Sequence, residues 1–393
     1  MSQDSVVIIA ARRTPIGAFQ GALSTVHAPA LSAAATRACI ADAGIEPGAI
    51  DEALIGCVLP AGVGQAPARQ AALAAGLPNG VGCITINKVC GSGMQAAMLG
   101  HDLIRAGSAK IVLAGGMESM SNAPYLLPKA RGGYRMGHHE VVDHMFIDGL
   151  QNAYDGKMMG VFAEDTARHY EFSREQQDAF AIESVTRART AAAAGAFDAE
   201  LTPVTVKSRK GEVIVDTDEE PGRANLEKIP TLRAAFAKDG TVTAANSSTI
   251  ADGAASLLLM SESEAASRGI TPLARIVGHA SHAHEPEWFT TAPVGAIKSL
   301  HERVGWSPVD VDLYEINEAF ACVTMAAMKD VGLDHAKVNV NGGACALGHP
   351  LGASGARIMA TLIHALRNRG GRRGIASLCI GGGEAVAIAV EII

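Results

Sequence analysis

Residues 87–94 read Asn-Lys-Val-Cys-Gly-Ser-Gly-Met, and the rest of the chain is organised around this stretch. Strand-forming residues precede it at 84–86, and a helical pattern follows over 94–105. A strand, a tight turn and a helix place Cys90 at or near a helix N-terminus, where free backbone N–H groups favour negative charge. We therefore expect a lowered pKa and a nucleophilic thiolate at Cys90. A buried core cysteine is the alternative, because cysteine is among the most buried residue types.

The composition is that of a globular enzyme. The chain has 393 residues, of which 48% are hydrophobic and 19% charged, and its net charge is -7. This charge, without any basic run, argues against a nucleic-acid partner, and no apolar stretch is long enough to span a membrane. The seven cysteines include no Cys-x-x-Cys pair, which favours a reducing compartment over a disulfide scaffold or a zinc site. Since no signal peptide is recognisable, we expect a cytoplasmic protein.

The first 120 residues alternate between strand-like and helical segments. Strands are expected at 6–11, 53–58 and 110–114, and helices at 30–43 and 68–75. Such alternation predicts an α/β protein with a mainly parallel sheet covered by helices on both faces.

Residues 121–248 have a different texture, with polar loops, a helical piece at 174–194 and a hairpin-like stretch at 204–215 around Lys210-Gly211. We interpret this part as an inserted, largely surface region. This region could be a surface insertion without a function, but long insertions in compact enzymes often carry binding residues.

The second half repeats patterns of the first. Residues 44–55 match 305–316 without a gap, and 111–116 resemble 377–382. Matches this short can be coincidental, but two in the same order favour an internal duplication.

Three further stretches stand out in the second half. Asn317 opens Asn-Glu-Ala-Phe at the end of a strand, and His349 lies in the glycine-punctuated loop 341–355, which enters a helix. Cys379 begins Cys-Ile-Gly-Gly-Gly after a buried strand. Taken singly, these could be a turn asparagine, a structural loop histidine and a core cysteine.

Together with Cys90, these stretches resemble the thiolase family, and the resemblance runs end to end. It implies two duplicated halves stacked in five layers (αβαβα) with an inserted loop domain that binds coenzyme A. The first half would comprise 1–120 plus 249–271, the loop domain 121–248, and the second half 272–393.

The resemblance also implies a reaction. Thiolases transfer an acyl group between a cysteine and coenzyme A, here a reversible Claisen condensation of two acetyl-CoA through an acetyl-cysteine. Cys90 would be the nucleophile, His349 its base, and Cys379 the acid–base group of the second step. His349 and a water held by Asn317 would donate to the enolate oxygen. Backbone N–H groups near Cys90 and Gly381 would form a second oxyanion hole.

Substrate contacts follow from the same resemblance. The pantetheine tunnel would be lined by Leu150, Ser248, Ala319 and Phe320. Arg223 would contact a phosphate, or be a solvated surface charge. Met158 stands where short-chain members commonly have histidine, which makes the acyl pocket more apolar, whereas Phe289 fills space. Acyl chain length therefore stays open.

The partners expected are acetyl-CoA, acetoacetyl-CoA and coenzyme A, with no permanently bound cofactor or metal. Relatives suggest a homo-oligomer, a dimer or tetramer, with a role in fatty acid metabolism. A longer-chain 3-ketoacyl-CoA thiolase is the first alternative, and a non-catalytic acyl-CoA-binding relative is an alternative of another class. A ketoacyl synthase or a cysteine hydrolase would not need the second cysteine, Cys379.

Overall fold

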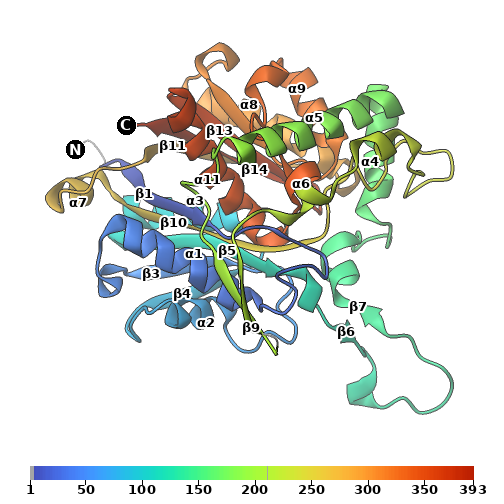
Figure 1. Ribbon diagram of the computed structural model, residues 1–393, viewed down its shortest axis with the longest axis horizontal. Coiled ribbons are helices and arrows are strands. Elements are labelled where there is room, and N and C mark those ends of the chain that lie inside the picture. Colours follow the sequence, from blue (N-terminus) through green and yellow to red (C-terminus); the bar gives the residue numbers. More distant parts are fainter. Residues whose placement is uncertain (1–3, 210) are drawn as a thin grey trace.

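The computed structural model describes residues 4–209 and 211–393. Figure 1 shows the N-terminal strands and helices in blue and cyan below the C-terminal ones in orange and red, with green segments of the middle of the chain beside them. The chain has three parts, a first half, a middle segment and a second half, each with its own strands and helices.

The first half is built from strands and helices in alternation. Its strands are β1 (Val6–Arg13), β2 (Gly17–Ala18), β3 (Glu52–Gly56), β4 (Gly82–Ile86), β5 (Ile111–Ser119) and β10 (Ala251–Ser261). Its helices are α1 (Ala28–Ala43), α2 (Pro67–Ala74), α3 (Ser92–Arg105) and α7 (Glu262–Ser267), with the short helix η1 (Pro47–Ala49). Each helix and strand expected here from the sequence is confirmed within a few residues, except that β5 runs five residues further than expected.

The second half repeats this order. Its strands are β11 (Ala274–Ala283), β12 (Leu313–Ile316), β13 (Arg373–Ile380) and β14 (Glu384–Ile392). Its helices are η6 (Pro286–Thr291), α8 (Ala292–Val304), η7 (Pro308–Asp310), α9 (Ala321–Val331), η8 (His335–Lys337), α10 (Ala344–Leu347) and α11 (Leu351–Arg369).

The strands form one ten-stranded sheet in the order β12-β13-β14-β11-β1-β10-β5-β3-β4, with β2 paired to β10. Of the strand pairs within the described residues, only β3 with β4, β3 with β5 and β12 with β13 are parallel. The expectation of a mainly parallel sheet is therefore wrong. The reason is visible after β13, where Gly382 and Gly383, at φ 102° and 92°, turn the chain directly back into β14. A turn this short can only join antiparallel neighbours.

The internal duplication is confirmed by the order of pairing. The first half reads β1-β10-β5-β3 and the second β11-β14-β13-β12, with the same parallel and antiparallel contacts. Gly44 and Gly305 end α1 and α8 in the left-handed conformation, at φ 60° and 69°, which glycine adopts without strain. A short helix, η1 or η7, then leads into β3 or β12.

The second of the two sequence repeats is displaced by four positions. Ile55 pairs with Gly115 in the first half, and the corresponding Ile316 pairs with Ser377 in the second. Ser377 therefore corresponds to Gly115, not to Ile111 as the sequence match had it. The match aligned two Gly-Gly pairs, one inside β5 and the other beyond the end of β13.

Helices and sheet form five layers, as the sequence resemblance implied. Helices α3 and α11 pack against each other in the largest apolar cluster, which includes residues from both halves of the sheet. Helices α1 and α2 cover the opposite face of the first half, and α8 and α9 that of the second. Burial of the sheet on both faces explains why its strands read as continuous apolar runs.

The two central helices cross with their backbones almost in contact. A Cβ atom on Gly355 would lie 2.3 Å from the backbone nitrogen of Met94, and one on Gly93 would lie 2.9 Å from that of Ala356. Only glycine permits this approach. The crossing lies in the first turns of both helices, so it brings their N-termini together.

The middle segment adds two longer helices, α4 (Met159–Tyr170) and α5 (Arg174–Ala193), and two hairpins. The predicted helix 174–194 is confirmed, and a capping box of Ser173 and Gln176 begins it. The predicted hairpin is confirmed as β8 (Val204–Ser208) with β9 (Gly211–Val215), although Lys210 lies outside the described residues.

The other hairpin, β6 (Tyr125–Leu126) with β7 (Val142–Asp143), belongs to an arm that projects from the body at the lower right of Figure 1. Shorter helices complete the segment: η2 (Met120–Asn122), η3 (Ala130–Gly132), η4 (Phe146–Leu150), α6 (Glu219–Arg223) and η5 (Leu226–Thr231). No helix of the described residues is long and apolar enough to cross a membrane.

Candidate active site

Cys90 lies where the sequence predicted it, between β4 and α3. It directly precedes Gly91, the N-cap residue of α3, and its side chain is buried in the central apolar cluster. The backbone N–H groups of Gly381 and of Cys90 itself point at its sulfur. A Cβ atom on Gly91 would lie 2.5 Å from a methyl group of Ile380, so the turn packs tightly under β13.

The pKa of Cys90 differs from the sequence expectation. Burial raises the pKa of the thiol to about 11, which outweighs the lowering by the two N–H groups. The expectation of a lowered pKa is therefore wrong for the free protein, because it considered the helix end and left out desolvation. Cys90 is a thiol at neutral pH, and its reactivity requires a neighbouring base.

The turn before Cys90 holds an unusual backbone conformation. Val89 has φ 43°, which is rare for a β-branched residue. Its N–H donates to Asn87 Oδ1 at 3.0 Å, and the Ser92 hydroxyl donates to its carbonyl at 2.7 Å while accepting the Lys88 N–H at 2.8 Å. The surrounding hydrogen bonds thus fix a strained turn that aims the Cys90 side chain, a pattern typical of functional sites.

His349 occupies the matching place in the second half. It directly precedes Pro350, the N-cap residue of α11, and it is buried. Its backbone N–H donates to the carbonyl of Thr249 at 3.0 Å. Because α3 and α11 cross near their first turns, Cys90 and His349 both reach the same cavity.

The hydrogen bonds of His349 define its tautomer. Its Nδ1 lies 2.6 Å from the Ser354 hydroxyl, and that hydroxyl lies 3.0 Å from the carbonyl of Pro350. The Ser354 proton is donated to this carbonyl, so the hydroxyl accepts the proton of Nδ1, and Nε2 carries the lone pair of the ring. Burial and, to a lesser extent, the charge of Arg357 lower the pKa of His349 to about 3. The imidazole is therefore neutral at physiological pH and can accept a proton at Nε2.

Asn317 lies beside this imidazole. It follows β12, its N–H donates to the carbonyl of Ser377 at 3.0 Å, and its Nδ2 lies 3.5 Å from His349 Nε2. Its Oδ1 accepts from Arg357 at 3.5 Å. Since a guanidinium only donates, Arg357 fixes the amide with its NH₂ group toward the histidine.

Arg357 and Ser354 are positioning residues that the sequence did not reveal. Arg357 is fully buried on α11, where it pairs with Glu315 at 3.5 Å. The available signal was that Arg357 is the one Lys, Arg, Asp or Glu of the stretch 351–366, because a buried arginine requires partners.

Cys379 lies inside β13 rather than after the strand, and its side chain is fully buried. It belongs to an apolar cluster that includes Phe162, Phe289 and Phe320. Burial raises the pKa of the thiol well above its ordinary value, and the nearby Cys90 and Cys322 raise it further. Cys379 and Cys90 are therefore near neighbours, and Cys379 carries its proton at neutral pH.

A cavity of about 450 Å³ opens onto Cys90 and His349. Its lining is predominantly apolar and comes from both halves and from the middle segment. Of the residues singled out from the sequence, it is lined by Cys90, Leu150, Met158, Ser248, Phe289, Ala319, Phe320, His349 and Gly381. Asn317 and Cys379 lie behind this lining, Asn317 beside His349 and Cys379 near Cys90.

Arg223 lies away from the cavity wall. It ends the short helix α6, its side chain is 56% exposed, and its guanidinium lies 3.3 Å from Glu219 and 3.8 Å from Glu220. Glu220 itself lines the cavity. The role of Arg223 in phosphate binding stays a prediction, and its charge is already opposed by two carboxylates.

The irregular segment before Ser248 also contributes lining residues that the sequence did not reveal, including Phe236. A Cβ atom on Gly160 would lie 2.3 Å from the Phe236 ring, so the glycine after Met158-Met159 makes room for this aromatic side chain. The ring of Phe320 meets that of Phe236 edge to face at 6.1 Å. No periodic pattern marks Phe236, which explains why it was missed.

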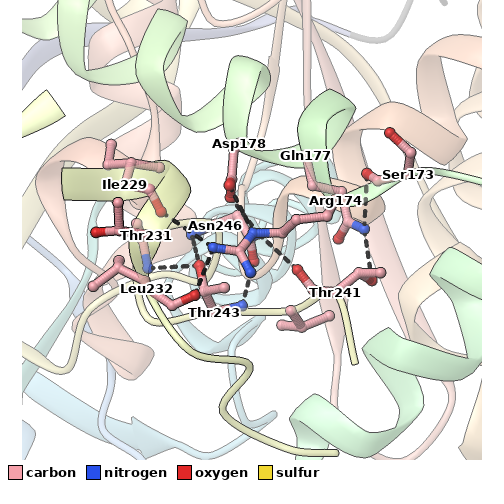
Figure 2. A network of polar contacts seen from close by, with 12 residues as sticks. Ser173, Arg174, Gln177, Asp178, Ile229, Thr231, Leu232, Thr241, Thr243 and Asn246 are labelled. Carbon is pink, nitrogen blue, oxygen red and sulfur yellow. Dashed lines mark hydrogen bonds and ion pairs between the residues drawn. The ribbon is translucent and has the colours of Figure 1, made fainter. Parts of the chain in front are cut away.

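A polar network holds this irregular segment against α5, as Figure 2 shows. Arg174 donates to Asp178 at 2.6 Å and to the carbonyls of Ile229 and Leu232 at 3.1 and 2.8 Å. Asn246 donates to the other oxygen of Asp178 at 2.9 Å. Helix α5 thereby holds in place the irregular segment that leads to Ser247 and Ser248, although this segment forms no regular secondary structure.

These features define what the site can do. A buried thiol and a neutral imidazole meet at the ends of two crossing helices, with N–H donors at the sulfur and an amide beside the imidazole. Such a site is suited to acyl transfer through a cysteine.

Models of known families identify the fold. The thiolase N-terminal domain matches residues 6–263 and the thiolase C-terminal domain matches residues 270–392. The chain therefore belongs to the thiolase family.

Individual relatives are similar over their full length. The chain is 50% identical to an acetyl-CoA acetyltransferase of Rhizobium meliloti (strain 1021) over 392 residues, which covers 100% of both chains. It is 49% identical to an acetyl-CoA acetyltransferase of Pseudomonas aeruginosa, covering 98% of each.

Two solved structures superpose closely. The crystal structure of the Bacillus anthracis acetyl-CoA acetyltransferase has a TM-score of 0.97 at 44% identity, and covers 100% of this chain and 99% of that one. The Acat5 thiolase from Ascaris suum, in complex with coenzyme A, has a TM-score of 0.94 at 44% identity, with coverage of 99% and 100%.

Proposed function

We propose that this protein is an acetyl-CoA C-acetyltransferase, which condenses two acetyl-CoA to acetoacetyl-CoA and coenzyme A or cleaves acetoacetyl-CoA in reverse. The observation that carries the proposal is the meeting of the Cys90 thiol and the neutral His349 imidazole in one apolar cavity. Relatives named acetyl-CoA acetyltransferase at about 50% identity support it.

In the direction of cleavage, His349 Nε2 takes the proton of Cys90, and the thiolate attacks the keto carbon of acetoacetyl-CoA. The backbone N–H groups of Gly381 and Cys90 stabilise the oxyanion of this adduct. The carbon–carbon bond then breaks, which leaves the acetyl group on Cys90 and the enolate of acetyl-CoA in the cavity.

The enolate carbon takes its proton from the Cys379 thiol, which the buried setting keeps protonated beforehand. His349 now carries the Cys90 proton on Nε2, so it can donate to the enolate oxygen together with a water held by Asn317. The donor role of His349 therefore requires the preceding proton transfer, because Nε2 has no proton in the free protein.

Coenzyme A completes the cycle. Its thiol returns a proton to Cys379, and its sulfur attacks the acetyl group on Cys90. As the bond to Cys90 breaks, the thiolate takes back the proton held by His349. Atoms and protons balance, and the reverse sequence gives condensation by a ping-pong mechanism.

One experiment separates this function from its rivals. Purified protein mixed with acetoacetyl-CoA should consume the enolate absorbance only when coenzyme A is also present. Loss without coenzyme A would indicate a hydrolase, and no loss in either case would indicate a non-catalytic acyl-CoA-binding protein.

The nucleophile is tested separately. Acetyl-CoA should add one acetyl group to the wild-type protein, visible by intact mass, and C90S should neither gain it nor turn over. Acetylation and normal turnover in C90S would refute the assignment of Cys90.

A longer-chain 3-ketoacyl-CoA thiolase is the second candidate, and the specific observation in its favour is Met158. Its thioether forms part of the cavity wall and gives an extended acyl chain apolar contact.

The oligomeric state and the cellular location of the protein are also proposed. We infer a homo-oligomer, either dimer or tetramer, that acts in the cytoplasm in fatty acid metabolism. Two exposed features support self-association: Tyr125 and Met136 on the projecting arm are 67% and 92% exposed, and the edge strand β4 exposes Ile84. Size-exclusion chromatography with light scattering measures the state directly.

A further inference from the structure

A cluster of potential metal ligands lies outside the site just described. Within residues 4–209 and 211–393, one group of three histidine, cysteine or acidic side chains brings its ligating atoms within 4.8 Å of one another: His101, Asp102 and His279. His101 and Asp102 lie near the C-terminal end of α3, and His279 lies on β11. The cluster thus joins the central helix of the first half to the first strand of the second.

The geometry is close to that of a transition-metal site. Asp102 Oδ1 lies 3.1 Å from His101 Nδ1 and 3.0 Å from His279 Nε2. The two imidazole rings stand at 90° with centroids 5.0 Å apart, and the nitrogens that they offer lie within 4.8 Å of each other. Ligands of a tetrahedral Zn²⁺ lie about 3.4 Å apart, which follows from metal–ligand distances of about 2.0–2.1 Å. Small side-chain movements would open the cluster to this spacing.

We propose that His101, Asp102 and His279 bind a divalent transition metal such as Zn²⁺, with water as the remaining ligand. Two imidazoles and a carboxylate suit Zn²⁺, Co²⁺ and Ni²⁺ better than Mg²⁺ or Ca²⁺, which prefer oxygen donors.

The cluster is open to solvent on one side. The His101 side chain is largely buried, whereas that of Asp102 is 58% exposed, which leaves a path for the ion and its water. Arg105 lies within electrostatic range of His101 and opposes a cation, so a moderate affinity is expected.

The role of the metal would be structural. His101 is eleven residues beyond Cys90 along the chain and helix, about 16 Å at 1.5 Å per residue, so a metal there cannot contact the reacting atoms. It would instead tie α3 to β11, and with them the two halves of the sheet.

The test uses Co²⁺ as a spectroscopic probe of the full-length, metal-free protein. We expect the visible d–d bands of a four-coordinate Co²⁺ with nitrogen and oxygen ligands, which Zn²⁺ should abolish by competition. The bands should be lost in H279Q and in D102N, and retained in H282Q, a matched control three residues along the same strand. All four proteins should show the same thiolysis activity and far-ultraviolet circular dichroism, because the site lies away from the cavity.

Two outcomes would overturn the proposal. The first is the absence of such bands, which would mean that Asp102 only accepts hydrogen bonds from two histidines. Bands that persist in H279Q and D102N would likewise refute it, because the ion would then bind at other residues. The second is a near-ultraviolet thiolate-to-cobalt band as the sole signal, which would place the ion at a cysteine. If H279Q fails to fold, D102N decides, since its exposed side chain can change without loss of packing.

Discussion

Cys90 and His349 occupy the same position in the two halves of this protein: each directly precedes the N-cap residue of a central helix, α3 or α11. The helices cross at Gly93 and Gly355, where their backbones nearly touch. The duplication and the crossing together bring the Cys90 thiol and the His349 imidazole to one cavity. The site is therefore a consequence of the fold's internal symmetry.

The first prediction concerns the tautomer of His349. In S354A, Nδ1 loses the acceptor that keeps its proton there, so part of the population should carry the proton on Nε2 and be unable to accept one from Cys90. We expect kcat for thiolysis to fall about tenfold, equivalent to about 1.4 kcal/mol, with little change in KM. S354T, which keeps the hydroxyl, is the control. Equal activity of S354A and wild type would contradict the tautomer assignment.

The second prediction links His349 to acid stability. Its pKa of about 3 in the folded protein lies below the ordinary value of about 6.5. The unfolded chain therefore binds an additional proton between these values, so stability is fully present above pH 6.5 and is lost as pH falls toward 3. From pH 7 to 5 this one group should lower the free energy of unfolding by about 2 kcal/mol. Urea unfolding of wild type and H349Q at both pH values measures it. The wild type should lose more stability than the variant, and equal losses would show that His349 is not held neutral.

The third prediction separates the half-reactions. In C379A, acetyl-Cys90 should still form from acetyl-CoA, because the proton that His349 takes from Cys90 can pass to the departing coenzyme A thiolate in place of the Cys379 proton. Condensation should fall by the roughly 10²–10⁴-fold typical of a lost acid–base group. Intact mass follows the first step, and steady-state acetoacetyl-CoA formation follows the second. A comparable loss in both would argue against this division between the two cysteines.

The fourth prediction concerns acyl chain length. Met158 and Phe289 both line the cavity, and the Phe289 ring is braced edge to face by Phe162 at 6.4 Å. Acetoacetyl-CoA should be the preferred substrate, but each added methylene that meets apolar surface gains roughly 0.8 kcal/mol. F289A should therefore raise kcat/KM for C8 relative to C4, and M158H should sharpen selection for C4. Thiolysis of C4 to C10 substrates by the three proteins provides the measurement. Identical profiles would mean that neither side chain borders the acyl group.

Much of this architecture could be predicted from the sequence. Hydrophobic periodicity, glycines at helix ends and prolines at helix starts are local properties of the chain. They predict the helices and strands of the first half, the helix over 174–194 and the duplication. The resemblance carried by Cys90, Asn317, His349 and Cys379 pointed to the family that the comparisons show. These features are recorded in short stretches, and so a single sequence suffices to find them.

The strand directions and the register of the second repeat were decided only by the tertiary structure. Whether β14 runs beside β13 or elsewhere depends on which strands pair, and pairing is a long-range property that alternating patterns do not encode. The four-residue displacement between 111–116 and 377–382 has the same origin, because register is set by hydrogen bonds between strands and not by matching glycines.

For the chemistry of the site, too, one part could be predicted from the sequence and another depends on the tertiary structure. The sequence by itself determined which residue types stand at the helix ends, a cysteine before α3 and a histidine before α11. Only the tertiary structure decided their protonation, because pKa values depend on burial and neighbours that come from distant segments. Desolvation by the packed central layer keeps Cys90 a thiol and His349 neutral, whereas a helix N-terminus considered alone predicted a thiolate.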